Sequence, residues 1–320
     1  MNDSIPRFAF VFPGQGSQSV GMMDALAAEF ACVRQRFDSA SEVLGFDLWK
    51  LVEAGPEAEL NSTQNTQPAL LAAGVATWDA WLESGGSRPQ MMAGHSFGEY
   101  TALVCAGALD YQSAVALVAD RGRFMQQAVP AGEGAMAAVL GLGLAELTDV
   151  CIQASAVGGV CSCANLNAPG QIVIAGTRDA VQRACEAATA GGAKRVMILP
   201  VSVPAHCALM RPAAEQFGQR LAAVDVGTPA IPVVHNVDVR THESAAAIRA
   251  ALVHQLESPV RWIETIEHFA ASGIGQIYEC GPGKVLSALI KRIDRTLQCR
   301  ALGDPEAIRD AAAHRTEDPS

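Results

Sequence analysis

The stretch Gly94-His95-Ser96-Phe97-Gly98 has the pattern G-x-S-x-G and follows a short apolar run at 91–93. A helical pattern begins directly after it, with apolar residues at 102–104 and 109. A strand, a sharp turn and a helix are the setting in which this motif presents a serine as a nucleophile. The two glycines leave room for neighbouring backbone, and the helix N-terminus offers N–H groups to a developing oxyanion. A glycine- and serine-rich turn without chemistry is the alternative, since the bare pattern is common.

The composition is typical of an α/β enzyme rich in small residues. The chain has 320 residues, of which 50% are hydrophobic and 5% aromatic, with 29 glycines and a net charge of −10. The negative charge argues against nucleic acid as a partner. No apolar run reaches the roughly 18 residues that a membrane-spanning helix needs, so we expect no membrane partner. We also expect a monomer.

Cysteine usage and the N-terminus predict a cytoplasmic protein. The nine cysteines are an odd number, and Met1 to Arg7 lacks the basic-then-apolar layout of a signal peptide. Both observations favour reduced thiols. Cys161 and Cys163 are close in sequence, but no second pair stands at zinc spacing. We therefore expect neither a metal nor a cofactor.

The apolar run Phe8 to Phe12 predicts a buried parallel strand that ends at Pro13. The loop Gly14-Gln15-Gly16-Ser17-Gln18 follows at its C-terminal end. A dinucleotide site is disfavoured, because Ser19 stands where G-x-G-x-x-G needs its third glycine. Ligands of open α/β sheets gather at strand C-termini, so Gln15 is a candidate site residue.

Hydrophobic periodicity and breaker residues predict the other elements of the larger body. The helices expected there are 24–54, Pro68 to Leu82, Gln112 to Gln127 behind the cap Asp110, Met210 to Val224, Ala245 to Gln255, Trp262 to Ala271 and Lys284 to Arg292. Two more strands are expected at Ile231 to His235 and Gln276 to Cys280. The tail from Glu306 is polar, and we expect it to fray.

The middle of the chain has a different rhythm and predicts an inserted domain at 131–201. Its strands are expected at Ala135 to Leu140, Val160 to Ala164, Gln171 to Ala175 and Arg195 to Leu199, with helices at Leu144 to Ala154 and Arg178 to Thr189. A turn is expected at 167–170. This βαββαβ order is the ferredoxin-like arrangement. The catalytic domain would then comprise 1–130 and 202–320.

A serine nucleophile needs a base, because its hydroxyl is almost wholly protonated at neutral pH. The chain has seven histidines. His95 is a poor candidate, because neighbours along a strand point to opposite faces. His254 lies within a predicted helix, and His242, His268 and His314 lie on polar or helical surfaces. His206 is best placed, in the proline-bounded loop where the chain returns to the larger body, although spacing alone leaves this open.

Seven segments in chain order resemble malonyl-CoA:acyl carrier protein transacylases. They are Phe12-Pro13-Gly14-Gln15-Gly16-Ser17-Gln18, Gly94-His95-Ser96-Phe97-Gly98-Glu99-Tyr100, Arg121-Gly122-x-Phe124-Met125, Asn165-x-Asn167-x-Pro169-Gly170-Gln171, Val203-Pro204-Ala205-His206, Ser258-Pro259-Val260-x-Trp262 and Glu279-x-Gly281-Pro282-Gly283. The resemblance covers nearly the whole chain, from residue 12 to residue 283. It implies an α/β-hydrolase-like large domain that carries the ferredoxin-like insert.

The resemblance also implies a mechanism. Ser96 would take the malonyl group from malonyl-CoA, with His206 as base and then acid, and pass it to the phosphopantetheine thiol of acyl carrier protein. The backbone N–H groups of Gln15 and Phe97 would form the oxyanion hole. Arg121 would hold the malonate carboxylate. A main-chain carbonyl, here that of Gln255, would orient the histidine in place of a triad acid.

The resemblance also suggests that Asn165 lines the acyl pocket. Two positions depart from the pattern of the family. Phe97 stands where a smaller aliphatic residue is frequent, and Ala205 stands where serine is common. Either change would reshape the pocket, so malonyl selectivity is less constrained by the sequence than the reaction type.

Three other functions remain open at this stage. A stand-alone acyltransferase of a polyketide synthase would use the same chemistry with another carrier protein. A thioesterase or esterase would have no need for Arg121. An inactive carrier-binding scaffold would not need Ser96, His206 and Arg121 together.

The basic segment Lys284 to Arg300 is a candidate docking surface for the acidic carrier protein. It holds five basic residues and one acid, Asp294, in a chain that is acidic overall. A solvated helix face is the alternative.

Overall fold

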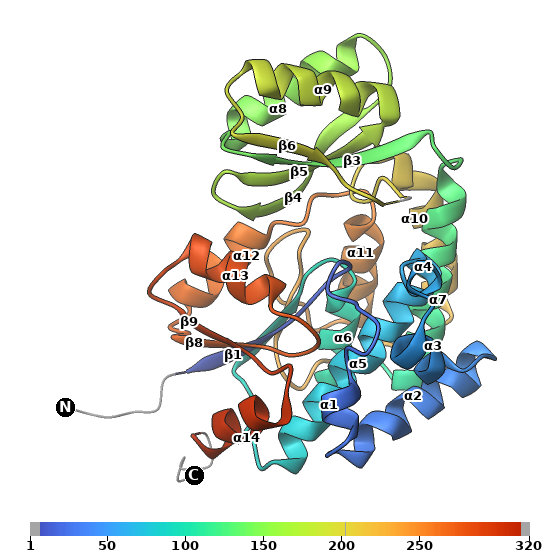
Figure 1. Ribbon diagram of the computed structural model, residues 1–320, viewed down its shortest axis with the longest axis vertical. Coiled ribbons are helices and arrows are strands. Elements are labelled where there is room, and N and C mark those ends of the chain that lie inside the picture. Colours follow the sequence, from blue (N-terminus) through green and yellow to red (C-terminus); the bar gives the residue numbers. More distant parts are fainter. Residues whose placement is uncertain (1–6, 202, 315–320) are drawn as a thin grey trace.

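The computed structural model describes residues 7–201 and 203–314. Three predictions therefore concern residues outside the described ranges. They are the lack of a signal peptide at Met1 to Arg7, of which only Arg7 is described, the start of the returning segment at 202, and the last part of the tail, 315–320. Figure 1 shows two sheets, a parallel one in the lower part of the view and a smaller antiparallel one above it.

The large sheet has five parallel strands. In spatial order they are β7 (Val233–Val234), β2 (Met91–Gly94), β1 (Phe8–Phe12), β8 (Gln276–Glu279) and β9 (Gln298–Ala301). The first strand of the chain is central, so its carboxyl end meets those of β2 and β8 at one edge. This edge is where ligands of parallel sheets gather.

Side chains on β1 alternate between two cores, because successive residues of a strand point to opposite faces. Phe8, Phe10 and Phe12 belong to the larger core, and Ala9 and Val11 to the second. The helices against the larger core include α2 (Ala31–Leu44), α5 (Thr63–Glu83), α6 (Gly98–Cys105), α7 (Tyr111–Ala128), α10 (Arg211–Ala222) and α11 (Ala245–Gln255). The second core is covered by α12 (Trp262–Ala271) and α13 (Val285–Ile293).

The antiparallel sheet is built from the central part of the chain. Its strands, in spatial order, are β4 (Cys161–Ala168), β5 (Gln171–Thr177), β3 (Gly134–Leu140) and β6 (Arg195–Ile198). The helices α8 (Leu144–Ala156) and α9 (Arg178–Ala190) pack on one face. The order of strands and helices is βαββαβ, so the predicted fold class, a parallel α/β body with a ferredoxin-like insert, is confirmed.

The insert is joined to the large body by more than its two ends. Asn165 of β4 forms a parallel bridge with Val260, whose carbonyl accepts the N–H of Leu166 at 2.9 Å. The uncovered face of the small sheet carries Met136 and Val173, which cluster with Cys207 of the large body. The space between the two sheets is therefore bounded by residues from both.

Several predicted boundaries were wrong for identifiable reasons. The region 24–54 is three helices, α1 (Asp24–Ala27), α2 and α3 (Leu48–Ala54), because Gly45 takes a left-handed φ of 76° and ends α2. Helix α5 begins at Thr63, five residues before Pro68, which lies inside it. Strand β4 continues to Ala168, so the predicted turn at 167–170 is confined to its last two residues.

Three elements near the C-terminal half also differ from the prediction. The strand expected at Ile231 to His235 is only two residues long. The expected fraying from Glu306 is wrong as far as residue 313, because α14 (Pro305–Ala313) buries Ile308 and Ala311 against the large core. Strand β9 was not predicted, since its residues are polar and only partly buried. Short elements complete the chain: α4 (Glu57–Leu60) and the 3-10 turn Ala208–Met210.

Candidate active site

The serine of the G-x-S-x-G stretch stands on a strained turn between β2 and α6. Ser96 has a φ of 54°, in the left-handed region that side chains with a Cβ rarely adopt. A Cβ at Gly94 would overlap the backbone of Gly98, and one at Gly98 would overlap the carbonyl of Phe12. Both glycines are therefore required, and the turn is a nucleophile elbow in its geometry.

His206 lies directly over this serine. Its Nε2 is 2.7 Å from Ser96 Oγ, and its Nδ1 is 2.8 Å from the carbonyl oxygen of Gln255 at the end of α11. A carbonyl only accepts, so Nδ1 carries the proton and Nε2 is free to accept the serine hydroxyl. The Gln255 carbonyl thus occupies the place that an acid holds in a Ser-His-Asp triad.

Burial keeps this histidine neutral. The pKa of His206 is lowered to about 3, first by burial and then by the positive charge of Arg121, against the smaller opposing effect of the Gln255 carbonyl. A neutral imidazole is the form that can accept a proton. The other histidine of the elbow, His95, bonds through Nε2 to Asn167 Oδ1 at 2.8 Å, and burial lowers its pKa as well.

Gln15 and Phe97 border the same cavity as Ser96. Phe97 precedes the first residue of α6, and Gln15 lies in the loop that follows β1. Within the described part of the chain, neither of their backbone N–H groups has a hydrogen-bond partner. Both are therefore available donors beside the nucleophile, as an oxyanion hole requires.

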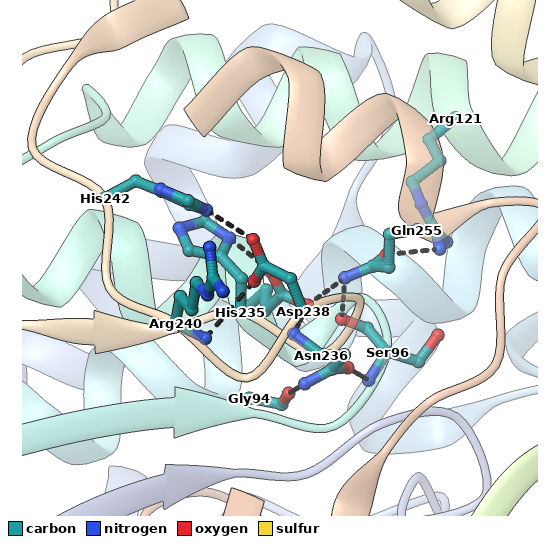
Figure 2. Close-up of polar contacts among 10 residues, drawn as sticks. Gly94, Ser96, Arg121, His235, Asn236, Asp238, Arg240, His242 and Gln255 are labelled. Atoms are coloured by element: carbon teal, nitrogen blue, oxygen red, sulfur yellow. Dashed lines mark hydrogen bonds and ion pairs between the residues drawn. The ribbon is translucent and has the colours of Figure 1, made fainter. Parts of the chain in front are cut away.

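Arg121 projects from α7 into the site although it is buried, with 1% of its surface exposed. Its guanidinium donates to two amide oxygens, Nη1 to Gln67 and Nη2 to Gln255, each at 3.0 Å. Figure 2 shows Gln255 between Arg121 and Ser96. A planar guanidinium can meet both oxygens of a carboxylate with parallel hydrogen bonds.

These residues share one cavity of about 410 Å³ between the two sheets. Ser96, His206 and Arg121 line it together with Asn165 from β4 of the insert, as the sequence predicted for Asn165. The structure thus brings every predicted site residue to one place. Gln255 reaches the site through its side chain as well as through its carbonyl.

A buried polar network behind the serine was missed by sequence analysis. Asn236 follows β7, and its side chain accepts the Ser96 N–H and donates to the Gly94 carbonyl, both at 2.7 Å (Figure 2). Glu99, fully buried in α6, accepts the Asn236 N–H at 3.0 Å and pairs with His235 at 2.7 Å. No local pattern indicates this network, because Glu99 and Asn236 are 137 residues apart in sequence.

The described residues form neither a metal-ligand cluster nor a helix that could span a membrane. No group of three or more histidine, cysteine or acidic side chains within residues 7–201 and 203–314 is arranged to hold a metal ion. Across the same ranges, every helix is too short or too polar to cross a bilayer.

Comparisons with known proteins agree with this geometry. The model of the acyl transferase domain family matches residues 9–308. The malonyl CoA-acyl carrier protein transacylase of Salmonella typhimurium is 54% identical over 302 residues, which cover 94% of this chain and 97% of that protein.

Solved structures show the same relationship. The malonyl CoA-acyl carrier protein transacylase of Coxiella burnetii superposes with a TM-score of 0.96 at 50% identity, over 98% of this chain and 99% of that one. A malonyl-transacylase in complex with its type II polyketide synthase acyl carrier protein gives a TM-score of 0.95 at 52% identity, over 96% and 99%. The chain therefore belongs to the acyl transferase domain family and, within it, to the malonyl CoA-acyl carrier protein transacylases.

Proposed function

We propose that this protein transfers the malonyl group of malonyl-CoA to the phosphopantetheine thiol of acyl carrier protein, for fatty acid biosynthesis, through a malonyl ester on Ser96. One observation carries the proposal. Ser96 Oγ is 2.7 Å from the unprotonated Nε2 of His206, in a cavity that also holds Arg121 without an acidic partner among the described residues.

In the first half-reaction, Ser96 Oγ attacks the thioester carbonyl carbon while its proton passes to His206 Nε2. The oxygen that becomes negative is met by the N–H groups of Gln15 and Phe97. The C–S bond then breaks, and the departing CoA sulfur takes the proton from His206. Serine is left as a malonyl ester, and the histidine is neutral again.

In the second half-reaction, the carrier thiol gives its proton to His206 and attacks the ester carbonyl. The bond to Ser96 breaks, and its oxygen recovers the proton. Throughout, Arg121 pairs with the free carboxylate of malonate, and the Gln255 carbonyl holds the imidazole through Nδ1. The two half-reactions balance with malonyl-CoA and the carrier alone, so we propose no further cofactor.

Intact-mass spectrometry after mixing with malonyl-CoA tests the proposal. The wild-type chain should gain one malonyl group and Ser96→Ala none. An adduct on Cys105 or Cys207 in place of the serine, or no adduct at all, would contradict it. Adduct loss without any acceptor thiol at a rate comparable to transfer would identify a thioesterase.

The carrier partner is proposed from the relatives. The relatives named above are malonyl CoA-acyl carrier protein transacylases, and one solved neighbour is a complex with a polyketide carrier. A panel of fatty acid and polyketide carrier proteins separates the two pathways by kcat/KM. We further propose a cytoplasmic monomer without nucleic-acid or membrane partners, which sedimentation and cell fractionation test directly.

A further inference from the structure

The guanidinium of Arg121 is oriented by amides and not by acids. Within the described residues, its two acceptors are the side-chain oxygens of Gln67 and Gln255, both in residues with 1% of their surface exposed. Within residues 7–201 and 203–314, no carboxylate lies at ion-pair distance from it. Such an arrangement is unusual, because a buried arginine is normally paired with an acid.

One of these amides also contacts a buried acid. Glu99 is fully buried, and its charge acts on Arg121. Its carboxylate, however, accepts from Gln255 Nε2, the Asn236 N–H and His235. Gln255 therefore stands between a buried cation and a buried anion, with its oxygen on the first and its nitrogen on the second.

Neutral acceptors have a specific effect on the guanidinium. A glutamine oxygen fixes one N–H of the fork as a glutamate oxygen would, but it adds no negative charge beside the guanidinium. The Nε of Arg121 is buried without a partner in the described structure, which adds to the unmet demand for an anion. An incoming carboxylate thus meets a guanidinium that is already oriented and not yet neutralised.

We propose that the neutrality of Gln67 and Gln255 determines the preference of the site for acyl groups that carry a second carboxylate. The inference rests on the proposed function, and it assigns Gln67 a role through Arg121 as a positioning and specificity residue. An acid at the position of Gln67 would give Arg121 an internal partner. The site would then repel malonate while an uncharged acetyl group could still be accepted.

Gln67 is the better of the two positions for a test. It comes from α5, in the helical turn before Pro68, and in the described chain it forms no hydrogen bond with Ser96 or His206. Its nitrogen makes only a 3.8 Å contact with Met125 Sδ, so replacing NH₂ by oxygen breaks no strong hydrogen bond. Gln255 also bonds the Ser96 carbonyl at 2.9 Å and contacts Glu99, so its substitution would remove several contacts at once.

The experiment compares Gln67→Glu and Gln67→Met with the wild type, using malonyl-CoA and acetyl-CoA as donors. Gln67→Glu should lower kcat/KM for malonyl-CoA by at least about a hundredfold, which lies within the range of about 30-fold to about 4,000-fold expected when a desolvated charge pair is lost. Acetyl transfer should stay within about threefold of wild type, because no charge on that group is involved. Gln67→Met has a similar volume without charge and should lose less malonyl transfer than Gln67→Glu.

The outcomes separate the inference from the function. Equal losses with both donors, or a wild-type preference for malonyl in Gln67→Glu, would overturn the inference. The proposed function is tested separately, by the acylation of Ser96 in the wild-type chain. If circular dichroism shows that Gln67→Glu is unfolded, Gln67→Asp and its neutral control Gln67→Asn decide. A malonyl loss that is larger in the acid than in the amide, with acetyl transfer spared, supports the inference, and equal losses in the two variants overturn it.

Discussion

Replacement of Arg121 by alanine tests the acyl selectivity of the site most directly. The change removes a buried guanidinium from a cavity whose other lining groups include Ser96 and His206. Malonate would then bring its second carboxylate into a partly dry space without a cationic partner. Acetyl lacks this carboxylate, so its transfer should stay level or improve.

The structure sets the magnitude. Loss of one partner of a desolvated, hydrogen-bonded charge pair costs about 2–5 kcal/mol, which corresponds to about 30-fold to about 4,000-fold in kcat/KM. Arg121 is 1% exposed and has no acidic partner in the described chain, so its charge is available to the malonate carboxylate. We therefore expect kcat/KM for malonyl-CoA to fall by at least about a hundredfold. The orphaned amide oxygens of Gln67 and Gln255 add about 1–3 kcal/mol each to the stability cost.

The assay is carrier acylation with each donor, combined with a thermal melt to separate stability from selectivity. Arg123→Ala is a matched control, because Arg123 lies on the same helix but is exposed and bonds Asp120 at 2.7 Å. It should leave both activities near wild type. A parallel fall of malonyl and acetyl transfer in Arg121→Ala would show that Arg121 is structural and that the carboxylate is held elsewhere.

Three further predictions follow from the same geometry. Gln255→Ala keeps the carbonyl that holds His206 and should cost far less acetyl transfer than His206→Ala; an acid-to-amide scan that finds a carboxylate as essential as His206 would contradict this. Charge reversal at Lys284 and Lys291, both exposed, should raise KM for the carrier and not for malonyl-CoA, whereas Lys50→Glu should change neither; equal effects on both substrates would exclude docking there. The acid limb of kcat/KM should lie well below pH 6.5, because the pKa of His206 is lowered to about 3 and the neutral form persists until the pH approaches that value; a limb at the ordinary histidine pKa would contradict the burial argument.

The candidate docking surface, Lys284 to Arg300, has fewer unpaired cations than its sequence suggested. Arg300 bonds Asp310 of α14 at 3.2 Å, and Arg292 donates to the side-chain oxygen of Gln171, so two of its five cations already have partners. Gly283, beside Lys284, packs against Ser17 of the loop that borders the cavity. Lys284 is therefore one residue away from a contact with the loop that borders the cavity.

The elbow and its surroundings could be predicted because local sequence determines them. The turn at Ser96 needs glycine at 94 and 98 on steric grounds, and the insert follows from its alternation of strand and helix patterns. His206 and Arg121 lie far from Ser96 in sequence, and spacing alone left both open. The resemblance to a known family assigned their roles.

The remaining parts depend on contacts that no local pattern shows. Asn236 follows a strand of two residues and resembles any loop asparagine until its side chain is seen against Ser96. Gln67 was placed outside α5, because Pro68 indicated a helix start that lies five residues too late. Strand β9 is partly exposed and polar, so hydrophobic periodicity could not reveal it.

The position of β1 at the centre of the large sheet has a consequence for how the molecule is made. Phe8 pairs in register with Gln276, and the two residues lie near opposite ends of the chain. During synthesis, β1 therefore leaves the ribosome long before its partner strand β8. Until then an unpaired edge is exposed, which favours slow folding and chaperone contact. The nucleophile likewise emerges before its base, and a nascent chain carries only an ordinary serine hydroxyl. Chains stopped before β8 should remain protease-sensitive and fail to acquire a malonyl group, whereas a stable, acylated fragment would contradict this order of assembly.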